Sequence, residues 1–280
     1  MTQTADLYCV FGNPIHHSKS PVIHAMFAKQ TGQAMDYQTN LAPLDGFAAS
    51  VQQFIEIGGK GANVTVPFKL EAFALAQKLS ARAAMAGAVN TLIFSAGEII
   101  GDNTDGIGLV RDITHNASKP IHGRRVLLLG AGGAARGALL PLLEERPASL
   151  TIANRTLSKA VELVEMAKKS AMRSDCEIEA KTWEQLDGSF DLIVNATSAS
   201  LQSEVPPIPS SIFSASSLAY DMMYADTQTR FNLYAQQCGA QTRDGLGMLI
   251  EQAAEAFFIW RGVRPETAPI FAHFRPVEGA

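Results

Sequence analysis

Two short polar runs place a lysine and an aspartate where acid–base chemistry is possible. The first run, Asn63 to Lys69, holds Asn, Thr and Lys among apolar residues, and the second, Gly101 to Gly106, contains Asp102 and Asp105. An ammonium can donate a proton to a developing alkoxide or bind a carboxylate, and a neighbouring carboxylate can orient it. The simpler alternatives are that Lys69 is a solvated lysine at a helix start and that the two aspartates form a turn.

Two further runs, Asn13 to Pro21 and Val89 to Thr91, add small polar side chains. Ligands of open α/β sheets bind outside the carboxyl ends of the strands, so these runs predict a site for a hydroxyl-rich small molecule. Ser20, which precedes a proline, is also a predicted helix N-cap. The run after Asp102 is not a calcium loop, because Ile107 stands where that loop needs glycine. We expect no metal site.

A glycine-rich turn follows a short apolar run over Val126 to Leu129. It reads Gly130-Ala131-Gly132-Gly133-Ala134-Ala135 and opens an amphipathic stretch. Gly130 permits a tight turn and Gly132 lets the backbone approach a pyrophosphate, while the helix start supplies free N–H groups. This pattern between a strand and a helix predicts dinucleotide binding.

The residues after the next apolar run, 149–153, favour a phosphorylated dinucleotide. They are Asn154, Arg155 and Thr156, with Lys159 one helical turn further on. NAD-binding folds usually place an acid here for the ribose 2′-hydroxyl, whereas a guanidinium binds a 2′-phosphate in a fork. The sequence therefore predicts NADP rather than NAD. The alternative is a loop with a surface arginine.

The elements that must position these residues alternate between strand and helix. The expected strands are Leu7–Phe11, Tyr37–Leu41, Ala62–Val66, the Val89–Phe94 and Glu98–Gly101 hairpin, Val126–Leu129, Ser149–Ala153, Phe190–Asn195 and Leu218–Tyr224. The expected helices are Ser20–Thr31, Gly46–Ile57, Ala72–Leu79, Ala81–Ala86, Ala134–Glu145 and Gly245–Trp260. The last helix carries an apolar stripe, and Gln252 lies off it, free to face a cleft.

The composition is that of an ordinary globular protein of two domains. The chain has 280 residues, 47% of them hydrophobic, and a net charge of −4, so it is not a nucleic-acid binder. Three scattered cysteines suggest reduced thiols in the cytoplasm, and neither a signal peptide nor a membrane-spanning stretch is apparent. We expect two α/β domains around a cleft, the second a Rossmann fold. Residues 1–105 plus about 242–280 form the substrate domain and residues about 106–241 the NADP domain.

Taken in order along the whole chain, these motifs resemble the shikimate dehydrogenase family. The resemblance rests on the runs already described, with Phe11–Pro14, Gly87–Thr91, Asn195–Ser198 and Asp244–Leu249. It implies reversible NADPH-dependent reduction of 3-dehydroshikimate to shikimate, in the pathway to chorismate and the aromatic amino acids. The implied protein is a monomer or homodimer.

The resemblance also implies roles for individual residues. Lys69 and Asp105 would be the catalytic pair. The substrate would contact Ser18, Ser20, Thr65, Lys69, Asn90, Asp105, Tyr224 and Gln252. NADP would contact Gly130, Ala131, Gly132, Gly133, Ala134, Asn154, Arg155, Thr156, Lys159, Met222 and Gly245.

Charge considerations favour Lys69 as proton donor and electrostatic clamp, with Asp105 orienting it. A free lysine is protonated at neutral pH, and a nearby carboxylate keeps it so. Two alternatives stay open: a quinate/shikimate dehydrogenase that uses NAD, and a non-catalytic NADP-binding regulator of the same fold. The first would be expected to carry an acid where Asn154 and Arg155 stand. The second has no need of Lys69 and Asp105.

Overall fold

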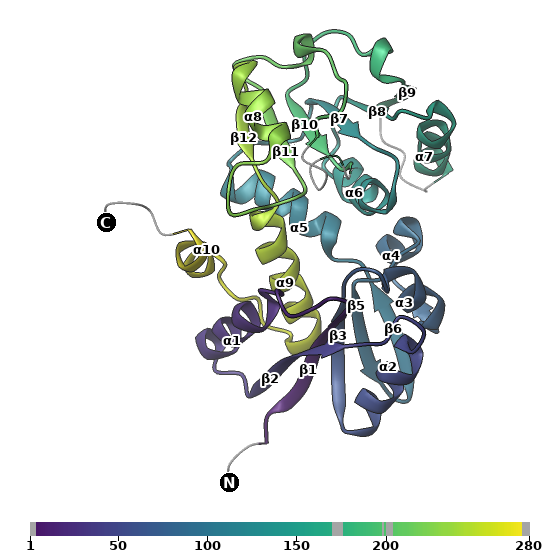
Figure 1. The fold of residues 1–280 in the computed structure, drawn as a ribbon, viewed down its shortest axis with the longest axis vertical. Helices are drawn as coiled ribbons and strands as arrows, with labels where there is room; N and C mark the ends of the chain where they lie inside the picture. The colour runs from purple at the N-terminus through teal and green to yellow at the C-terminus, as the bar shows by residue number, and fades with distance from the viewer. Residues whose placement is uncertain (1–3, 170–175, 198, 200–203, 276–280) are drawn as a thin grey trace. The chain divides into compact units, whose positions relative to one another are not determined.

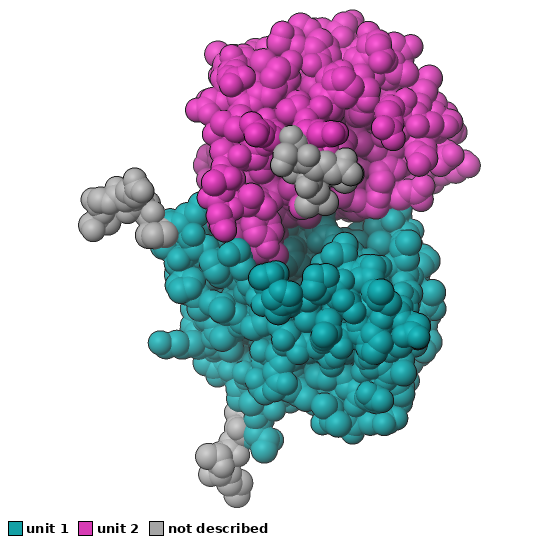
Figure 2. Space-filling view, viewed as in Figure 1, with its two compact units in different colours: residues 1–108, 250–280 teal, residues 109–249 magenta. Residues whose placement is uncertain are grey.

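The structure, a computed structural model, describes residues 4–169, 176–197, 199 and 204–275 (Figure 1). Ser198, the last residue of one family motif, lies outside these residues. The chain divides into two compact units (Figure 2). Unit 1 comprises residues 1–108 and 250–280, and unit 2 comprises residues 109–249. Within the described residues each unit is built on one six-stranded sheet.

The sheet of unit 1 brings four polar loops to one edge. Its strands are β1 (Asp6–Gly12), β2 (Met35–Leu41), β3 (Gly59–Val64), β4 (Lys78–Leu79), β5 (Thr91–Ser95) and β6 (Glu98–Asp102), in the order β2-β1-β3-β5-β6-β4. Strand β5 runs antiparallel to β3 and β6, and the neighbouring pairs are otherwise parallel. The carboxyl ends of β1, β3 and β6 and the start of β5 therefore meet at the same edge.

Helices α1 (Ser20–Thr31), α2 (Phe47–Glu56), α3 (Lys69–Leu75), α4 (Ala81–Ala86) and α10 (Ala268–Phe274) belong to unit 1. Helix α1 corrects one expectation, because its N-cap is Lys19 and Ser20 is its first residue. Helix α3 corrects another: it ends four residues before Leu79, because Lys78 and Leu79 pair with β6 as strand β4. Buried phenylalanines, among them Phe11, Phe47 and Phe68, fill the core between sheet and helices.

The sheet of unit 2 is fully parallel and has the Rossmann strand order. Its strands are β7 (Arg125–Leu129), β8 (Ser149–Ala153), β9 (Glu177–Lys181), β10 (Leu192–Asn195), β11 (Leu218–Asp221) and β12 (Gln241–Arg243), in the order β12-β11-β10-β7-β8-β9. Helices α6 (Gly133–Glu144), α7 (Leu157–Lys169) and α8 (Arg230–Gln237) connect them. The strand order reverses between β7 and β10, which is where such sheets bind nucleotides.

Two helices carry the chain between the units. Helix α5 (Asp105–Arg111) begins in unit 1 and ends in unit 2, and α9 (Leu246–Arg261) returns. The apolar stripe expected on α9 includes the fully buried Ile250, Ala253 and Phe257, but the polar Gln252 is also buried. None of the helices described here is long and apolar enough to cross a membrane.

Candidate active site

Lys69 and Asp105 form an ion pair at the polar edge of the unit 1 sheet. Lys69 is the first residue of α3, and Asp105, which follows the end of β6, is the first residue of α5. The Lys69 Nζ lies 2.6 Å from Asp105 Oδ2, and the two side chains are 30% and 19% exposed. The pair is thus open to a ligand while its geometry is set by two helix starts. An ammonium held in this way can donate a proton or hold a developing negative charge.

Asn90 and Gln252 join this pair through hydrogen bonds. Asn90 Nδ2 donates to the free oxygen of Asp105, Oδ1, over 2.8 Å, and lies 3.4 Å from Gln252 Oε1. Thr104 Oγ1 donates to the same glutamine oxygen over 3.3 Å. Lys69 therefore belongs to one hydrogen-bonded group with four side chains from three separate stretches of sequence. The group combines a cation, a carboxylate, two amides and a hydroxyl, and its other members are Asn90, Thr104, Asp105 and Gln252.

Ser18 and Thr65 lie on two loops at the same sheet edge, and Ser20 is the first residue of α1, directly after the first of these loops. The loops that follow β1 and β3 are joined by backbone hydrogen bonds from Asn13 N to Val66 O and from Thr65 N to Phe11 O. Ser18 Oγ accepts a bond from the backbone N–H of Ser20. The Ser20 side chain is buried, whereas Ser18 and Thr65 are partly exposed. All three hydroxyl groups therefore belong to the loop cluster that also carries Asn90.

A second, more buried charge pair supports the β6 end of the site. Arg82 donates two hydrogen bonds to Asp102, of 2.8 and 2.9 Å, and a third to Glu255. Burial alone would raise the pKa of Asp102, but the bonds from Arg82 and Ser80 outweigh it and hold this pKa below its ordinary value. Asp102 therefore stays ionised and fixed, three residues before Asp105, and serves the structure of the loop.

In unit 2 the glycine turn has the geometry that the sequence predicted. Gly130 has a φ of 104°, and a Cβ there would lie 3.2 Å from the backbone of Ala196, so this position favours glycine. A Cβ at Gly132 or Gly133 would meet nothing within 4 Å. The first turn of α6, which begins at Gly133, therefore faces open space into which its N–H groups can bind an anion.

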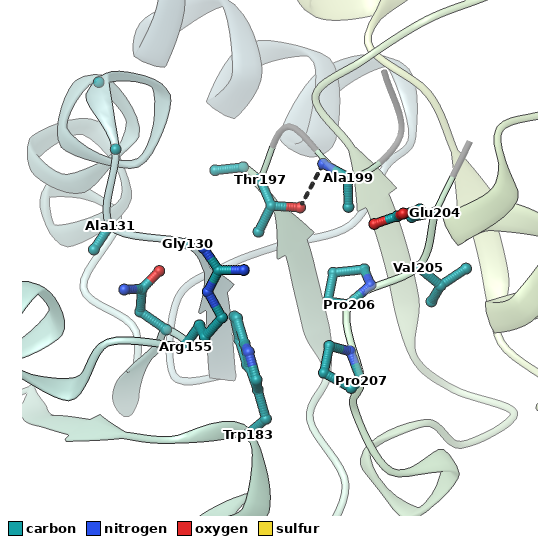
Figure 3. Close-up of a pocket in the computed structure, with 14 residues that line it drawn as sticks. Gly130, Ala131, Arg155, Trp183, Thr197, Ala199, Glu204, Val205, Pro206 and Pro207 are labelled. Carbon is teal, nitrogen blue, oxygen red and sulfur yellow. Dashed lines mark hydrogen bonds between the residues drawn. The ribbon is translucent and has the colours of Figure 1, made fainter. Parts of the chain in front are cut away.

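A pocket of about 550 Å³ opens in front of this turn at the switch point of the sheet (Figure 3). Loops after β7, β8 and β10 line it, together with a proline-containing segment. The lining residues are Gly130, Ala131, Gly132, Gly133, Asn154, Arg155, Trp183, Ala196, Thr197, Ala199, Glu204, Val205, Pro206 and Pro207. Arg155 is the one basic residue among them. The volume, the glycine turn and the guanidinium fit a phosphorylated dinucleotide.

The remaining residues predicted for the NADP site lie outside this lining. Ala134, Thr156 and Lys159 are exposed, and Asn154 Nδ2 donates to Thr156 O over 2.9 Å, which closes the loop after β8. Gly245 packs so closely on Met222 that a Cβ would overlap the Met222 carbonyl group. Packing alone therefore requires glycine at this position.

Tyr224, the one predicted substrate residue of unit 2, follows strand β11 and is 36% exposed. Burial of the rest of its side chain raises the pKa of its phenol above the ordinary value, so the hydroxyl stays protonated at neutral pH.

The sequence did not single out several residues that lie around the two sites. Trp183 and the segment from Glu204 to Pro207 line the dinucleotide pocket, but no spacing rule links them to the glycine turn. In unit 1 the buried Asn63, Thr91 and Thr104 surround Asn90. The one available signal for these three was their position inside the polar runs 63–69, 89–91 and 101–106.

Unit 2 has a parallel sheet of Rossmann order, with a glycine turn and an arginine at its switch point, and unit 1 presents an ion-paired lysine. These features define a dinucleotide-dependent oxidoreductase. Family models agree with this class. Residues 10–92 match the shikimate dehydrogenase substrate binding domain, residues 112–203 match shikimate / quinate 5-dehydrogenase, and residues 245–270 match the shikimate 5'-dehydrogenase C-terminal domain. The chain belongs to the shikimate dehydrogenase family.

Individual relatives cover nearly the whole chain. It is 60% identical over 275 residues to the shikimate dehydrogenase (NADP(+)) of Herminiimonas arsenicoxydans, an alignment that covers 98% of this chain and 99% of the relative. Among solved structures, an Ael1 enzyme from Pseudomonas putida has a TM-score of 0.91 and 48% identity, covering 98% and 99% of the two chains. The shikimate 5-dehydrogenase of Thermus thermophilus, solved in complex with NADP(H) and shikimate, has a TM-score of 0.82 and 29% identity, covering 96% and 98%.

Proposed function

We propose that this protein catalyses the reversible NADPH-dependent reduction of 3-dehydroshikimate to shikimate. The observation that carries the proposal is the ion pair of Lys69 and Asp105, bonded through Asn90 at the sheet edge where ligands bind. Membership of the shikimate dehydrogenase family supports the substrate, and the name of the 60% identical relative supports NADP. The alternative of a quinate/shikimate dehydrogenase that uses NAD is not favoured, because the loop after β8 has Asn154 and Arg155 where NAD binding would be expected to place an acid.

Lys69 acts as the proton donor in the direction of reduction. As hydride reaches the substrate carbonyl carbon, the carbonyl oxygen gains negative charge; the Lys69 ammonium stabilises this charge and gives the oxygen a proton. Asp105 holds the ammonium through Oδ2, and its other oxygen, Oδ1, accepts a hydrogen bond from Asn90. In the reverse direction the neutral amine of Lys69, which has lost its proton, accepts the proton of the substrate hydroxyl and returns to the ammonium form.

The other predicted contacts divide by chemistry. Ser18, Ser20, Thr65 and Gln252 supply hydroxyl and amide groups for the hydroxyls and carboxylate of the substrate, and Tyr224 supplies a phenol from unit 2. Their support is their place on the polar loops at strand ends and the family motifs that contain most of them. Unit 1 is then the substrate-binding unit and unit 2 the NADP-binding unit.

The pocket of unit 2 would hold NADP through the turn at Gly130 to Ala134 and through Asn154 to Lys159. NADPH supplies the hydride when bound. The open backbone of Gly132 and Gly133 binds the pyrophosphate, and Arg155 binds the 2′-phosphate. Met222 and Gly245 are proposed for the nicotinamide end. The cytoplasm as location and a monomer or homodimer as assembly remain predictions.

The test is the appearance of NADPH absorbance with shikimate and NADP⁺, repeated with NAD⁺ and with quinate. Lys69→Met should lower kcat by about 10²- to 10⁴-fold. Lys78→Met is the matched control, because Lys78 also lies in unit 1 in a 2.6 Å ion pair, with Glu98. Absence of wild-type activity with shikimate would refute the function, and retention of kcat within about threefold in Lys69→Met would refute the role of the lysine.

The cofactor assignment has a separate test. Arg155→Ala should reduce the ratio of NADP⁺ to NAD⁺ specificity by about 10- to 150-fold, the value of one charge-assisted contact. Arg230→Ala is the control, since Arg230 is an exposed arginine of unit 2 outside the pocket lining. An unchanged ratio in Arg155→Ala would exclude this arginine as the reader of the 2′-phosphate.

A further inference from the structure

A buried chain of hydrogen bonds runs behind the Lys69–Asp105 pair. Tyr37 OH donates to Asn63 Oδ1 over 2.7 Å, and Asn63 Nδ2 lies 3.2 Å from Thr91 Oγ1. Thr91 Oγ1 in turn lies 2.9 Å from Asn90 Oδ1. Asn63 and Asn90 are buried, Thr91 is fully buried, and Tyr37 is 8% exposed. The chain therefore links strand β2 to the active-site amide through β3 and β5.

The direction of every bond in this chain is fixed by two groups at its active-site end. The backbone N–H of Thr104, which can only donate, lies 2.9 Å from Asn90 Oδ1. The carboxylate of Asp105, which can only accept, lies 2.8 Å from Asn90 Nδ2. The Asn90 amide is thus held with its oxygen toward Thr91 and its nitrogen toward Asp105.

The remaining directions follow from this orientation. Because Asn90 Oδ1 is an acceptor, the Thr91 hydroxyl must donate to it and use a lone pair to accept from Asn63 Nδ2. The same Asn63 nitrogen donates to the backbone carbonyl oxygen of Asn90 over 3.2 Å, so Asn63 Oδ1 faces Tyr37 and accepts a hydrogen bond from its hydroxyl. Burial raises the pKa of Tyr37 well above its ordinary value, so its hydroxyl remains a donor.

We infer that Thr91 is a positioning residue, which acts through Asn90 to keep an amide N–H on Asp105. This inference rests on the proposed function. If the side-chain amide of Asn90 were flipped, its oxygen would face the Asp105 carboxylate, so that two acceptors would lie against each other. This contact would disturb the carboxylate that orients Lys69. Thr91 cannot contact substrate, since it is fully buried. Its hydroxyl favours the productive orientation together with the Thr104 N–H.

The test replaces the Thr91 hydroxyl by a methyl group of the same shape. Thr91→Val should lower kcat/KM for shikimate about fivefold, the value of one neutral hydrogen bond, with KM for NADP⁺ unchanged. Thr91→Ser, which keeps the hydroxyl, should restore kcat/KM to within about twofold of wild type. Thr151→Val is the matched control, because Thr151 is a buried strand threonine of unit 2 that bonds Glu179. It should leave the shikimate kinetics unchanged.

A second variant covers the case in which Thr91→Val does not fold. Tyr37→Phe, made in a Ser20→Ala background because the Tyr37 hydroxyl also bonds Ser20, removes the hydroxyl at the far end of the chain. It should lower kcat/KM for shikimate by about twofold to threefold relative to Ser20→Ala. The inference would be overturned if the shikimate kinetics were unchanged in whichever of the two variants, Thr91→Val and Tyr37→Phe, folds. So would a fall in Thr91→Val that Thr91→Ser does not reverse.

Failure of the proposed function is separable from failure of this inference. A wild type that is inactive with shikimate refutes the function. In that case the side-chain amide NMR signals of Asn90 decide the positioning role. Slow solvent exchange of the Asn90 NH₂ protons that becomes fast in Thr91→Val supports it, and equal exchange in both proteins overturns it.

Discussion

His24 is a buried imidazole whose protonation should weaken unit 1 in mild acid. It has no exposed surface and stacks on Tyr37 with ring centroids 4.1 Å apart and an interplanar angle of 8°. The rings of Phe27, Phe257 and Trp260 surround the rest of it. Burial lowers the pKa of His24 to about 3, although its neighbour Asn63 opposes the shift.

The sign and size of the effect follow from linkage. The folded state keeps this imidazole neutral, while the unfolded chain binds a proton at its ordinary pKa of about 6.5. Between those two values the unfolded state holds the extra proton, so stability falls as pH falls, by about 1.4 kcal/mol per pH unit well below 6.5. From pH 7 to pH 5 the histidine should therefore cost unit 1 about 2 kcal/mol.

The assay compares His24→Leu with its parent at both pH values, so that every other titrating group cancels in the difference. The chain has two tryptophans. Trp183→Phe leaves Trp260, whose ring centroid lies 5.5 Å from that of His24, as the fluorescent reporter of unit 1 during urea unfolding. The parent should lose about 2 kcal/mol relative to His24→Leu between pH 7 and pH 5.

The control is His122→Gln in the same background, because His122 is exposed. Its change between the two pH values is the baseline against which the change in His24→Leu is read. A difference between His24→Leu and its parent that changes by less than about 0.5 kcal/mol from pH 7 to pH 5 would refute the reasoning, since it would mean that the folded state protonates this imidazole as readily as the unfolded chain does.

Three further predictions concern unit 2, with free energies from urea unfolding. Gly245→Ala should destabilise the unit by about 1–3 kcal/mol, because its Cβ overlaps the Met222 carbonyl group; an unchanged value would contradict the packing. Asp112→Asn should cost about 3 kcal/mol by removing the buried carboxylate charge that pairs with Arg243, and wild-type stability would refute this. Gly132→Ala should leave stability unchanged but raise KM for NADP⁺ about tenfold, since its Cβ enters open space that the cofactor needs; an unchanged KM would contradict the site.

Local patterns were sufficient to predict most elements of the fold. The β5–β6 hairpin, the glycine turn and the strand over residues 149–153 follow from periodicity and turn chemistry within a few residues, and the structure confirms them. The stretch expected to be helical as far as Leu79 was wrong at its end. Lys78 and Leu79 join β6, a partner some 20 residues away, and no local signal reveals that pairing.

The interior of the site was less predictable than its surface. Lys69, Asp105 and Asn90 stand in recognisable polar runs, and the structure joins them by direct bonds. Thr91 and Thr104 stand in the same runs, yet nothing in the sequence separates a threonine that faces a ligand from one that is buried behind it. That distinction depends on the pairing of β3, β5 and β6, which decides the side of the sheet edge on which each hydroxyl lies.

Asp112 shows how one buried charge can serve both chain crossings. It follows α5 directly, is fully buried, and accepts two 2.6 Å bonds from Arg243 and one of 2.8 Å from Tyr220 OH. The same phenol oxygen accepts the backbone N–H of Met248 on α9, and Gly247 packs so closely on the carboxylate that no Cβ fits. The outgoing helix α5 and the returning helix α9 are therefore anchored in unit 2 at a single side chain. Because the anchor joins residues more than 100 positions apart, only the fold reveals that an aspartate at a helix end is a structural requirement.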